Sequence, residues 1–324
     1  MTQIKDLPDK IRLGISSCLL GQAVRYDGGH KRDPYLVETL GQFVEWVPVC
    51  PEVECGLPVP REAMHLVGDP AAPHLVTVRS HIDHTERMLQ WAKRRVAELE
   101  RENLCGFIFK SKSPSSGLER VKVYGGDGAG VGEKVGVGLW ARAFIEHFPL
   151  LPAEEEGRLQ DPLLRENFIE RIFVLKRWRD FLRDGGRRGG LVEFHADHKM
   201  LIMSHNEVAM RQLGKLVAGA KAGKPGEVLA QYESTMLKAL KRLATPRQHA
   251  NVLEHLMGFL KKHLSADEKQ ELLALIDQFK QGLVPLIVPI TLLDHYARKY
   301  DESYLCRQVY LHPHPLELKL RNHV

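Results

Sequence analysis

Long apolar runs are missing from this sequence of 324 residues. The longest, Leu283–Leu293, is interrupted by Pro285 and Pro289, and it is too short to span a bilayer as a helix. The opening residues MTQIKDLPDK contain no apolar core of the kind that signal peptides carry. We therefore expect a cytoplasmic protein with no membrane partner.

Cysteine is also scarce, since the chain has only five. An odd, small number of cysteines without a secretory signal favours a reducing compartment, where thiols serve metal binding or redox chemistry rather than disulfides. Cys18 and Cys50 lie in polar turns, which suits a metal or iron–sulfur ligand better than a buried packing residue. Cys55 is a possible spare ligand, whereas Cys105 and Cys306 lie in apolar surroundings and are expected in the core.

A phosphate-binding motif is absent from the glycine-rich stretch Gly125–Gly138, which has seven glycines in fourteen residues. This stretch matches neither GxGxxG nor the Lys-Ser/Thr ending of a P-loop. We therefore expect no nucleotide cofactor here, and a mobile flap beside the functional site is the better interpretation.

What is present is one pattern that occurs three times: a short apolar run followed at once by a turn of small or reactive residues. The runs are Ile11–Ser17, Phe43–Val49 and Phe107–Phe109, with a helix predicted over Ser80–Asn103 as a crossover between strands. Parallel strands in one sheet would bring the three turns to the same carboxyl edge, where open α/β sheets bind ligands. The predicted site then contains Cys18, Cys50, Glu52, Ser113 and Ser116.

Two of these side chains have alternative interpretations. Glu52 directly follows Cys50-Pro51, so it is either a group that transfers protons in the pocket or a carboxylate that caps a helix or forms a salt bridge. Ser113 flanks Pro114, so its hydroxyl either faces the substrate or shapes a turn.

The second half changes to helical periodicity. The predicted helices are Asp161–Arg183, Leu191–Val217, Gly226–Leu243, Arg247–His263 and Ala266–Lys280. Prolines 149 and 152 and the acidic run 154–156 mark the boundary. We therefore predict two domains, an α/β domain with a parallel sheet at residues 1–150 and an all-α domain at residues 151–324.

The charge is concentrated in the helical half, where residues 171–247 contain 16 Lys and Arg against 7 Asp and Glu. This surplus favours an anionic partner, with nucleic acid first, although a solvated helical surface would have the same composition. The candidate RNA-binding residues, with Trp178 among them for stacking, are Arg171, Lys176, Arg177, Arg179, Arg183, Arg187 and Arg188. His195, His198 and His205 share a helical face as a metal triad or as a packing face.

These motifs carry a resemblance to two known families. The first half resembles the DUF523 family, the thiouracil desulfidase type, in the blocks SSCLLGQAVRYDGGHKRD, VPVCPEVECGLPVPRE and KSKSPSSGLERVKVYG. The second half resembles DUF1722 in the blocks LVEFHADHKMLIMSH, NVLEHLMGFLKKHLS, VPITLL and YLHPHPLELKLRN. The fusion is similar to bacterial desulfidases that act on 4-thiouridine in tRNA.

The resemblance implies a Rossmann-like catalytic domain, a helical RNA-facing domain, and a 4Fe–4S cluster held by three cysteines with one iron open to the substrate sulfur. Two of the ligands fall on Cys18 and Cys50, and the essential Glu and Ser of the family fall on Glu52 and Ser113. The third family cysteine falls on Ser116. A neutral hydroxyl is a poor iron ligand, so we expect an inactive variant whose cluster is absent or incomplete, unless Cys55 or Cys105 substitutes.

Overall fold

The structure, a computed structural model, describes residues 10–126, 128 and 130–323. The chain forms two compact units, Met1–Asp161 and Pro162–Val324. The division falls beyond the expected boundary at residue 150 because Ala153–Glu155 forms a strand, β8, that pairs with β5 (Phe107–Phe109) of the first unit.

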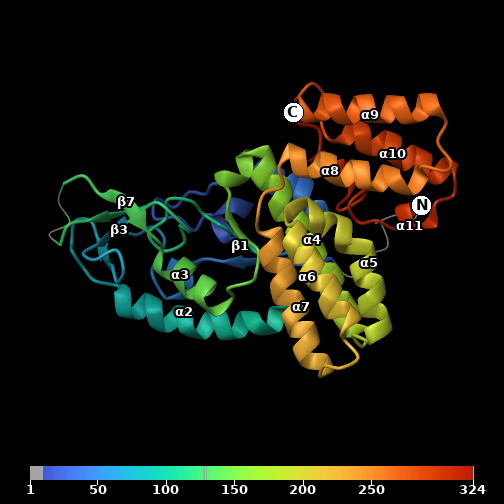
Figure 1. Ribbon diagram of the computed structural model, residues 1–324. Coiled ribbons are helices and arrows are strands. Elements are labelled where there is room, and N and C mark those ends of the chain that lie inside the picture. Colours follow the sequence, from blue (N-terminus) through green and yellow to red (C-terminus); the bar gives the residue numbers. More distant parts are fainter. Residues whose placement is uncertain (1–9, 127, 129, 324) are drawn as a thin grey trace. The chain divides into compact units, whose positions relative to one another are not determined.

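A four-stranded parallel sheet organises the first unit, as the sequence predicted (Figure 1). Its order is β2-β1-β5-β8, with β1 at Ile11–Ser16 and β2 at Val44–Val49. The register runs from Ile11 opposite Val44 to Ser16 opposite Val49, so both strands end at the same edge. The more specific expectation of a Rossmann-like fold stays a prediction.

A second sheet, which the sequence did not indicate, has the order β4-β3-β6-β7. Its strands are β3 (Met64–Val67), β4 (His74–Thr77), β6 (Val121–Tyr124) and β7 (Glu133–Gly136). β3 and β6 are parallel, whereas the two outer pairs are antiparallel. The stretch expected to be a flap contributes β7 to this sheet, and its residues 127 and 129 lie outside the described part of the chain.

Helices α2 (Thr85–Leu99) and α3 (Leu139–His147) pack on each other and close the core of this unit. Trp91 of α2 and Trp140 of α3 are buried with ring centroids 4.9 Å apart, and Trp140 also packs against Phe107 of β5. The shorter turns of helix are η2 (Ser17–Leu20), η3 (Tyr35–Thr39), η4 (Leu40–Gln42), α1 (Pro51–Glu54), η5 (Glu100–Glu102) and η6 (Arg158–Gln160).

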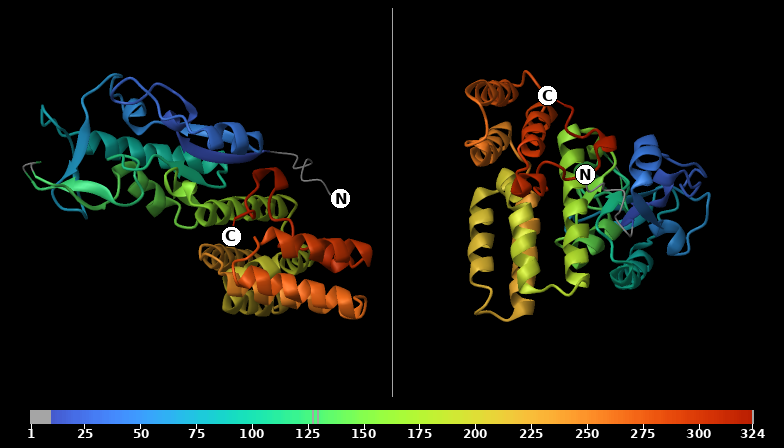
Figure 2. Two further views of the ribbon diagram at one scale, coloured as in Figure 1. Left: turned by 90° about the horizontal axis from the view of Figure 1, so that it is seen from above. Right: turned by 90° about the vertical axis from the view of Figure 1, so that its right-hand side faces the viewer.

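The second unit is helical, as predicted. Figures 1 and 2 show α5, α6 and α7 side by side, while α8, α9 and α10 run across them. The helices are α4 (Pro162–Arg183), α5 (Arg188–His205), α6 (Glu207–Ala218), α7 (Pro225–Leu240), α8 (Pro246–Met257), α9 (Ala266–Lys280), α10 (Ile287–Lys299) and α11 (Ser303–Cys306), with η7 (Gly258–Leu260) and η8 (Leu316–Leu318). None of the helices in the described part of the chain combines the length and apolar character needed to cross a membrane.

The single helix expected over Leu191–Val217 is in fact two helices, α5 and α6. Asn206 interrupts it with an extended backbone, at φ −159° and ψ 98°, and its side chain accepts a hydrogen bond from the amide of Ala209. Asparagine is a favoured helix cap because its side-chain oxygen satisfies an amide that has no partner within the helix. The apolar periodicity continues across this cap, which is why the sequence pattern concealed the break.

Candidate active site

The candidate site lies where three parallel strands end. β1 continues into η2, which carries Cys18, and β2 ends at Cys50, the residue before α1. β5 ends before the serine turn, defined as Ser113–Gly117, and the Lys110 amide at this strand end donates to Ser16 Oγ of β1 at 2.9 Å. The turns therefore meet at one edge because the sheet is parallel and in register.

The serine turn is fixed by the start of α3. The amide of Ala141 donates to the carbonyl of Ser115 at 3.1 Å. Gly138 lies directly against this backbone, since a Cβ at that position would be 2.4 Å from the Ser115 carbonyl. The contact requires glycine, and it fixes the serine hydroxyls in the pocket beside the cysteines.

All five residues of the predicted site line one cavity of about 390 Å³: Cys18, Cys50, Glu52, Ser113 and Ser116. They come from three segments that are far apart in the sequence, so the juxtaposition depends on the fold. The geometry predicted from strand order is therefore present, while the role of each residue stays a prediction.

Glu52 and Ser113 are connected through Ser115, a residue that the sequence did not single out. Ser115 is fully buried and its hydroxyl donates to Glu52 Oε1 at 2.5 Å. Its oxygen lies 2.9 Å from Ser113 Oγ, and because the Ser115 proton is committed to Glu52, Ser113 is the donor in this second contact. The two hydroxyls form a chain of hydrogen bonds directed from Ser113 through Ser115 to the Glu52 carboxylate. In the sequence, the repeated serines of SPSSG are the one signal that could have indicated this chain.

Arg61 is the other residue that the sequence analysis missed. Its buried guanidinium lies 3.7 Å from Glu52 Oε2 and donates to the carbonyl of Val24 at 3.0 Å. Arg61 therefore places a fixed positive charge behind the carboxylate. No sequence pattern connects residues 52 and 61, since the contact depends on the loop between α1 and β3.

Both cavity cysteines are protonated at neutral pH in this structure. Burial raises the pKa of Cys18 to about 11, although Lys110 opposes the effect. Burial and the nearby Glu52 raise the pKa of Cys50 to about 12, and Cys50 Sγ lies 3.6 Å from Glu52 Oε2. A metal that bound both sulfurs would have to displace two protons.

The remaining cysteines lie elsewhere. Cys55 Sγ contacts the carbonyl of Glu52 at 3.2 Å and packs against the core, outside the residues that line the cavity. Cys105 is buried, as predicted, but it precedes β5 and therefore belongs to the opposite edge of the sheet. Cys306 is exposed, so its expected place in the core is wrong.

The expected RNA-binding residues of the helical unit separate into two groups. Arg171 and Lys176 are buried, and Lys176 is ion-paired with Asp180 at 2.6 Å. Arg177 donates to the carbonyl of Pro313, and burial lowers its pKa to about 10. Trp178 is fully buried against Tyr232, with ring centroids 5.1 Å apart, so in this arrangement it has no face open for a base.

The exposed members of the set are Arg183, Arg187 and Arg188, and Arg179 is half-buried. These side chains lie near the end of α4 and the start of α5. The charges of the expected set that are exposed therefore lie at this corner, whereas Arg171, Lys176 and Arg177 pack within the unit.

The histidines of α5 fit the packing interpretation. His195 Nδ1 lies 3.1 Å from the Tyr232 hydroxyl, and His198 Nδ1 contacts the Phe194 carbonyl at 2.8 Å. His205 Nδ1 contacts the Arg242 carbonyl at 2.6 Å. Each ring is thus committed to a different partner, and the three do not converge on one point.

The fold and the site together define a two-unit protein whose first unit carries a pocket lined by two thiols and a carboxylate. Residues 13–156 match the 2-thiouracil desulfurase family, and residues 199–315 match DUF1722, a family of unknown function. The chain belongs to these two families, one in each unit.

Two known proteins are similar to this chain. It is 32% identical over 158 residues to the uncharacterized protein YbgA of Escherichia coli K12, a match that spans 48% of this chain and 94% of YbgA. The solved structure of the [4Fe-4S]-dependent thiouracil desulfidase TudS is 30% identical, and the match spans 47% of this chain and 95% of that chain with a TM-score of 0.40.

Proposed function

We propose that the first unit is the catalytic unit of an iron–sulfur-dependent desulfidase that removes sulfur from a thiolated uracil. The observation that carries the proposal is the single cavity lined by Cys18, Cys50, Glu52 and Ser113. Membership of the 2-thiouracil desulfurase family over residues 13–156 supports it.

The donor set fits a cluster at two positions and fails at the third. Cys18 and Cys50 supply two thiols at the cavity wall, and Ser116 supplies a buried hydroxyl. A serine hydroxyl stays protonated at neutral pH and is a poor partner for iron beside thiolates. Since neither Cys55 nor Cys105 lines the cavity, we propose that the chain as written holds an incomplete cluster and is inactive or nearly so.

The chain's own residues supply the proton transfer. Glu52 takes a proton from the water that attacks the thiocarbonyl carbon, and Arg61 holds this carboxylate in position from 3.7 Å away. The Ser113–Ser115 pair carries a proton between the cavity and Glu52. A bound 4Fe–4S cluster would supply a Lewis acid for the sulfur. One water replaces one sulfur, which leaves as hydrogen sulfide, so the reaction balances without an electron donor.

The proposed substrate is 4-thiouridine in tRNA, because the helical unit carries the surplus of positive charge in residues 171–247. Free thiouracil or a thiouridine nucleotide is the alternative substrate, and a non-catalytic RNA-binding protein is the alternative class. Cytoplasmic location belongs to the same proposal.

The substitution Ser116→Cys tests the function. We expect the chain as written to be folded with little intact cluster. The Ser116→Cys protein, prepared without oxygen, should contain about four irons and release sulfide from a thiolated uracil. A full cluster and normal turnover without the substitution would show that the third ligand lies elsewhere, and a Ser116→Cys protein with a full cluster but no turnover would overturn the proposed reaction.

A further inference from the structure

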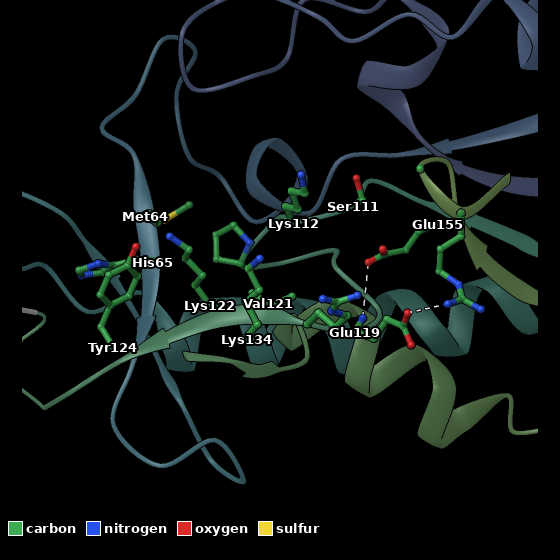
Figure 3. A pocket seen from close by; sticks show the side chains of 14 residues that line it. Met64, His65, Ser111, Lys112, Glu119, Val121, Lys122, Tyr124, Lys134 and Glu155 are labelled. Atoms are coloured by element: carbon green, nitrogen blue, oxygen red, sulfur yellow. Dashed lines mark hydrogen bonds and ion pairs between the residues drawn. The ribbon is translucent and has the colours of Figure 1, made fainter. Parts of the chain in front are cut away.

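A second, larger cavity adjoins the cysteine cavity in the first unit. Its volume is about 620 Å³, and it shares Met64, Ser111, Lys112 and Pro114 with the cysteine cavity. Figure 3 shows lysine and aromatic side chains gathered around it from β3, β6 and the loop after β5. A substrate seated at the cysteines therefore has adjoining space for more than a base.

The outer face of the second sheet forms one wall of this cavity. Successive residues of a strand point to opposite faces, and in β6 the buried residues Val121 and Val123 turn toward the core. Lys122 and Tyr124 consequently share the outer face. Lys134 of β7 is paired directly with Lys122, and its side chain also lines the cavity.

The pairing of Lys122 with Lys134 is unfavourable by itself, because like charges directly opposite on antiparallel strands destabilise a sheet. Lys112 and Arg120 add two more positive charges to the cavity lining, and both have left-handed backbones, at φ 59° and 56°. Such a conformation is unfavourable for a non-glycine residue. Strain and repulsion at one cavity are features of functional sites.

Four cations of this cavity are called the phosphate set below: Lys112, Arg120, Lys122 and Lys134. Within the described part of the chain, no carboxylate forms an ion pair with any of them. The neighbouring Arg158 provides the contrast, since Glu119 and Glu154 hold it at 2.8 and 2.7 Å. Glu119 and Glu155 also line the cavity, but Glu119 is paired with Arg158 and Glu155 accepts a hydrogen bond from the Leu118 amide at 2.8 Å. The cavity lining therefore has a surplus of positive charge, which an anionic ligand would neutralise.

An aromatic pair completes the cavity. The rings of His65 and Tyr124 lie 4.9 Å apart with a tilt of 40°, and both side chains are half-buried in the cavity wall. Positive charge that follows a phosphate chain, together with rings that contact bases or riboses, is the usual composition of a site for single-stranded nucleic acid.

We propose that the second cavity binds the phosphates of a thiolated uridine substrate, so that the enzyme acts on nucleotides or RNA and not on the free base. The inference rests on the proposed function for the placement of the thiolated base at the cysteines. The phosphate set contacts the phosphate groups, and His65 and Tyr124 contact the ribose or the adjacent base. A free base would leave all four charges without a partner.

Binding measurements on the chain as written test this proposal without a cluster. Titration calorimetry with uridine 5′-monophosphate, uridine and a short oligouridylate distinguishes a single phosphate from a strand. We expect the monophosphate to bind at least about tenfold more tightly than uridine. The oligouridylate should bind more tightly than the monophosphate if the natural ligand is RNA, and its affinity should fall with salt. Equal affinity for uridine and the monophosphate would overturn the proposal.

The double substitution Lys122→Glu with Lys134→Glu should remove the preference for the phosphate. The milder pair Lys122→Gln with Lys134→Gln should weaken the preference for the monophosphate. Because it removes the charges without reversing them, it tests the same site with less risk of disturbing the fold. The matched control is Lys93→Glu, because Lys93 is exposed on α2 and lies outside the cavity. A preference that survives the double substitution would contradict the assignment.

The two proposals fail separately. If uridine and its monophosphate bind alike while the Ser116→Cys protein desulfidates free thiouracil, the phosphate site is wrong and the proposed function stands. If the monophosphate preference is present and the Ser116→Cys protein holds a cluster without turnover, the proposed function is wrong and the phosphate site stands.

Discussion

Glu52 is the residue on which the polar contacts of the site converge. Ser115 donates to one of its oxygens at 2.5 Å, and the other lies 3.7 Å from Arg61 and 3.6 Å from Cys50 Sγ. The Glu52 side chain is half-buried: it lines the cavity, and its contacts with Ser115 and Arg61 hold it in position. A carboxylate held in this way can exchange a proton with a bound water.

We expect Glu52→Gln, made in the Ser116→Cys background, to lower turnover by about 10²-fold or more, the scale of lost acid–base catalysis. The amide keeps the shape of the side chain but cannot accept the proton, so cluster content should not change. Turnover and iron content are measured on the same preparation. The control is Glu86→Gln, since Glu86 is exposed in the first turn of α2.

Ser115→Ala in the same background should cause a smaller loss, about tenfold or more, because a hydrogen bond to a charged group contributes about 1.5–3 kcal/mol. Its removal also interrupts the chain from Ser113 to Glu52. Near-normal rates in both variants would show that the proton path runs through other groups.

Among the elements, the repeated strand and turn gave the most reliable prediction from the sequence. The edge that gathers Cys18, Cys50 and the serine turn follows from parallel strands in register, and such strands are readable from short apolar runs. The helix predicted over Ser80–Asn103 contains α2, which begins later, at Thr85, and ends at Leu99, where the chain continues as the short 3₁₀ helix η5.

The second sheet could not be predicted in the same way. Its strands have four residues each and are separated in the chain by α2, β5 and the serine turn. Four residues give too few alternations to establish a period of two. Arg61 and Ser115 were missed for a related reason, since their partners are set by tertiary contacts that no spacing in the sequence encodes.

At the junction of α4 and α5, we expect the triple substitution of Arg183, Arg187 and Arg188 to Glu to weaken tRNA binding and flatten its salt dependence. These side chains are exposed, and each phosphate contact that is lost also removes released counterions. Filter binding of tRNA at several salt concentrations measures both effects.

The control for that triple variant reverses the same number of charges elsewhere in the unit, at Lys261, Lys262 and Lys280, which are also exposed. If both triple variants bind alike, the effect is one of net charge and the junction has no special part in RNA recognition. Arg177 is excluded from the test because its substitution would disturb the interior contact with Pro313.

On the scale of the whole molecule, the helical unit contains several buried histidines. Burial lowers the pKa of His195 and His314 to about 4, and that of His198 and His249 to about 3. Burial and the neighbouring Glu170 both raise the pKa of Glu166, to about 7. Below about pH 6 the interior therefore holds four neutral imidazoles together with one carboxyl, Glu166, that is mostly protonated.

These shifts predict that the chain loses stability as pH falls from about 6.5 toward 4. Unfolded histidines gain protons below about 6.5, whereas the buried rings stay neutral, so the unfolded state binds more protons and acid favours it. Each such histidine contributes up to about 1.4 kcal/mol per pH unit, and protonated Glu166 offsets one of the four. Urea unfolding followed by far-UV circular dichroism at pH 7, 6 and 5 measures how the free energy of unfolding changes with pH.

The variant His198→Gln should reduce this pH dependence, whereas His255→Gln should leave it unchanged because His255 is exposed. A stability that does not vary between pH 7 and 5 would contradict the neutral state of the buried rings.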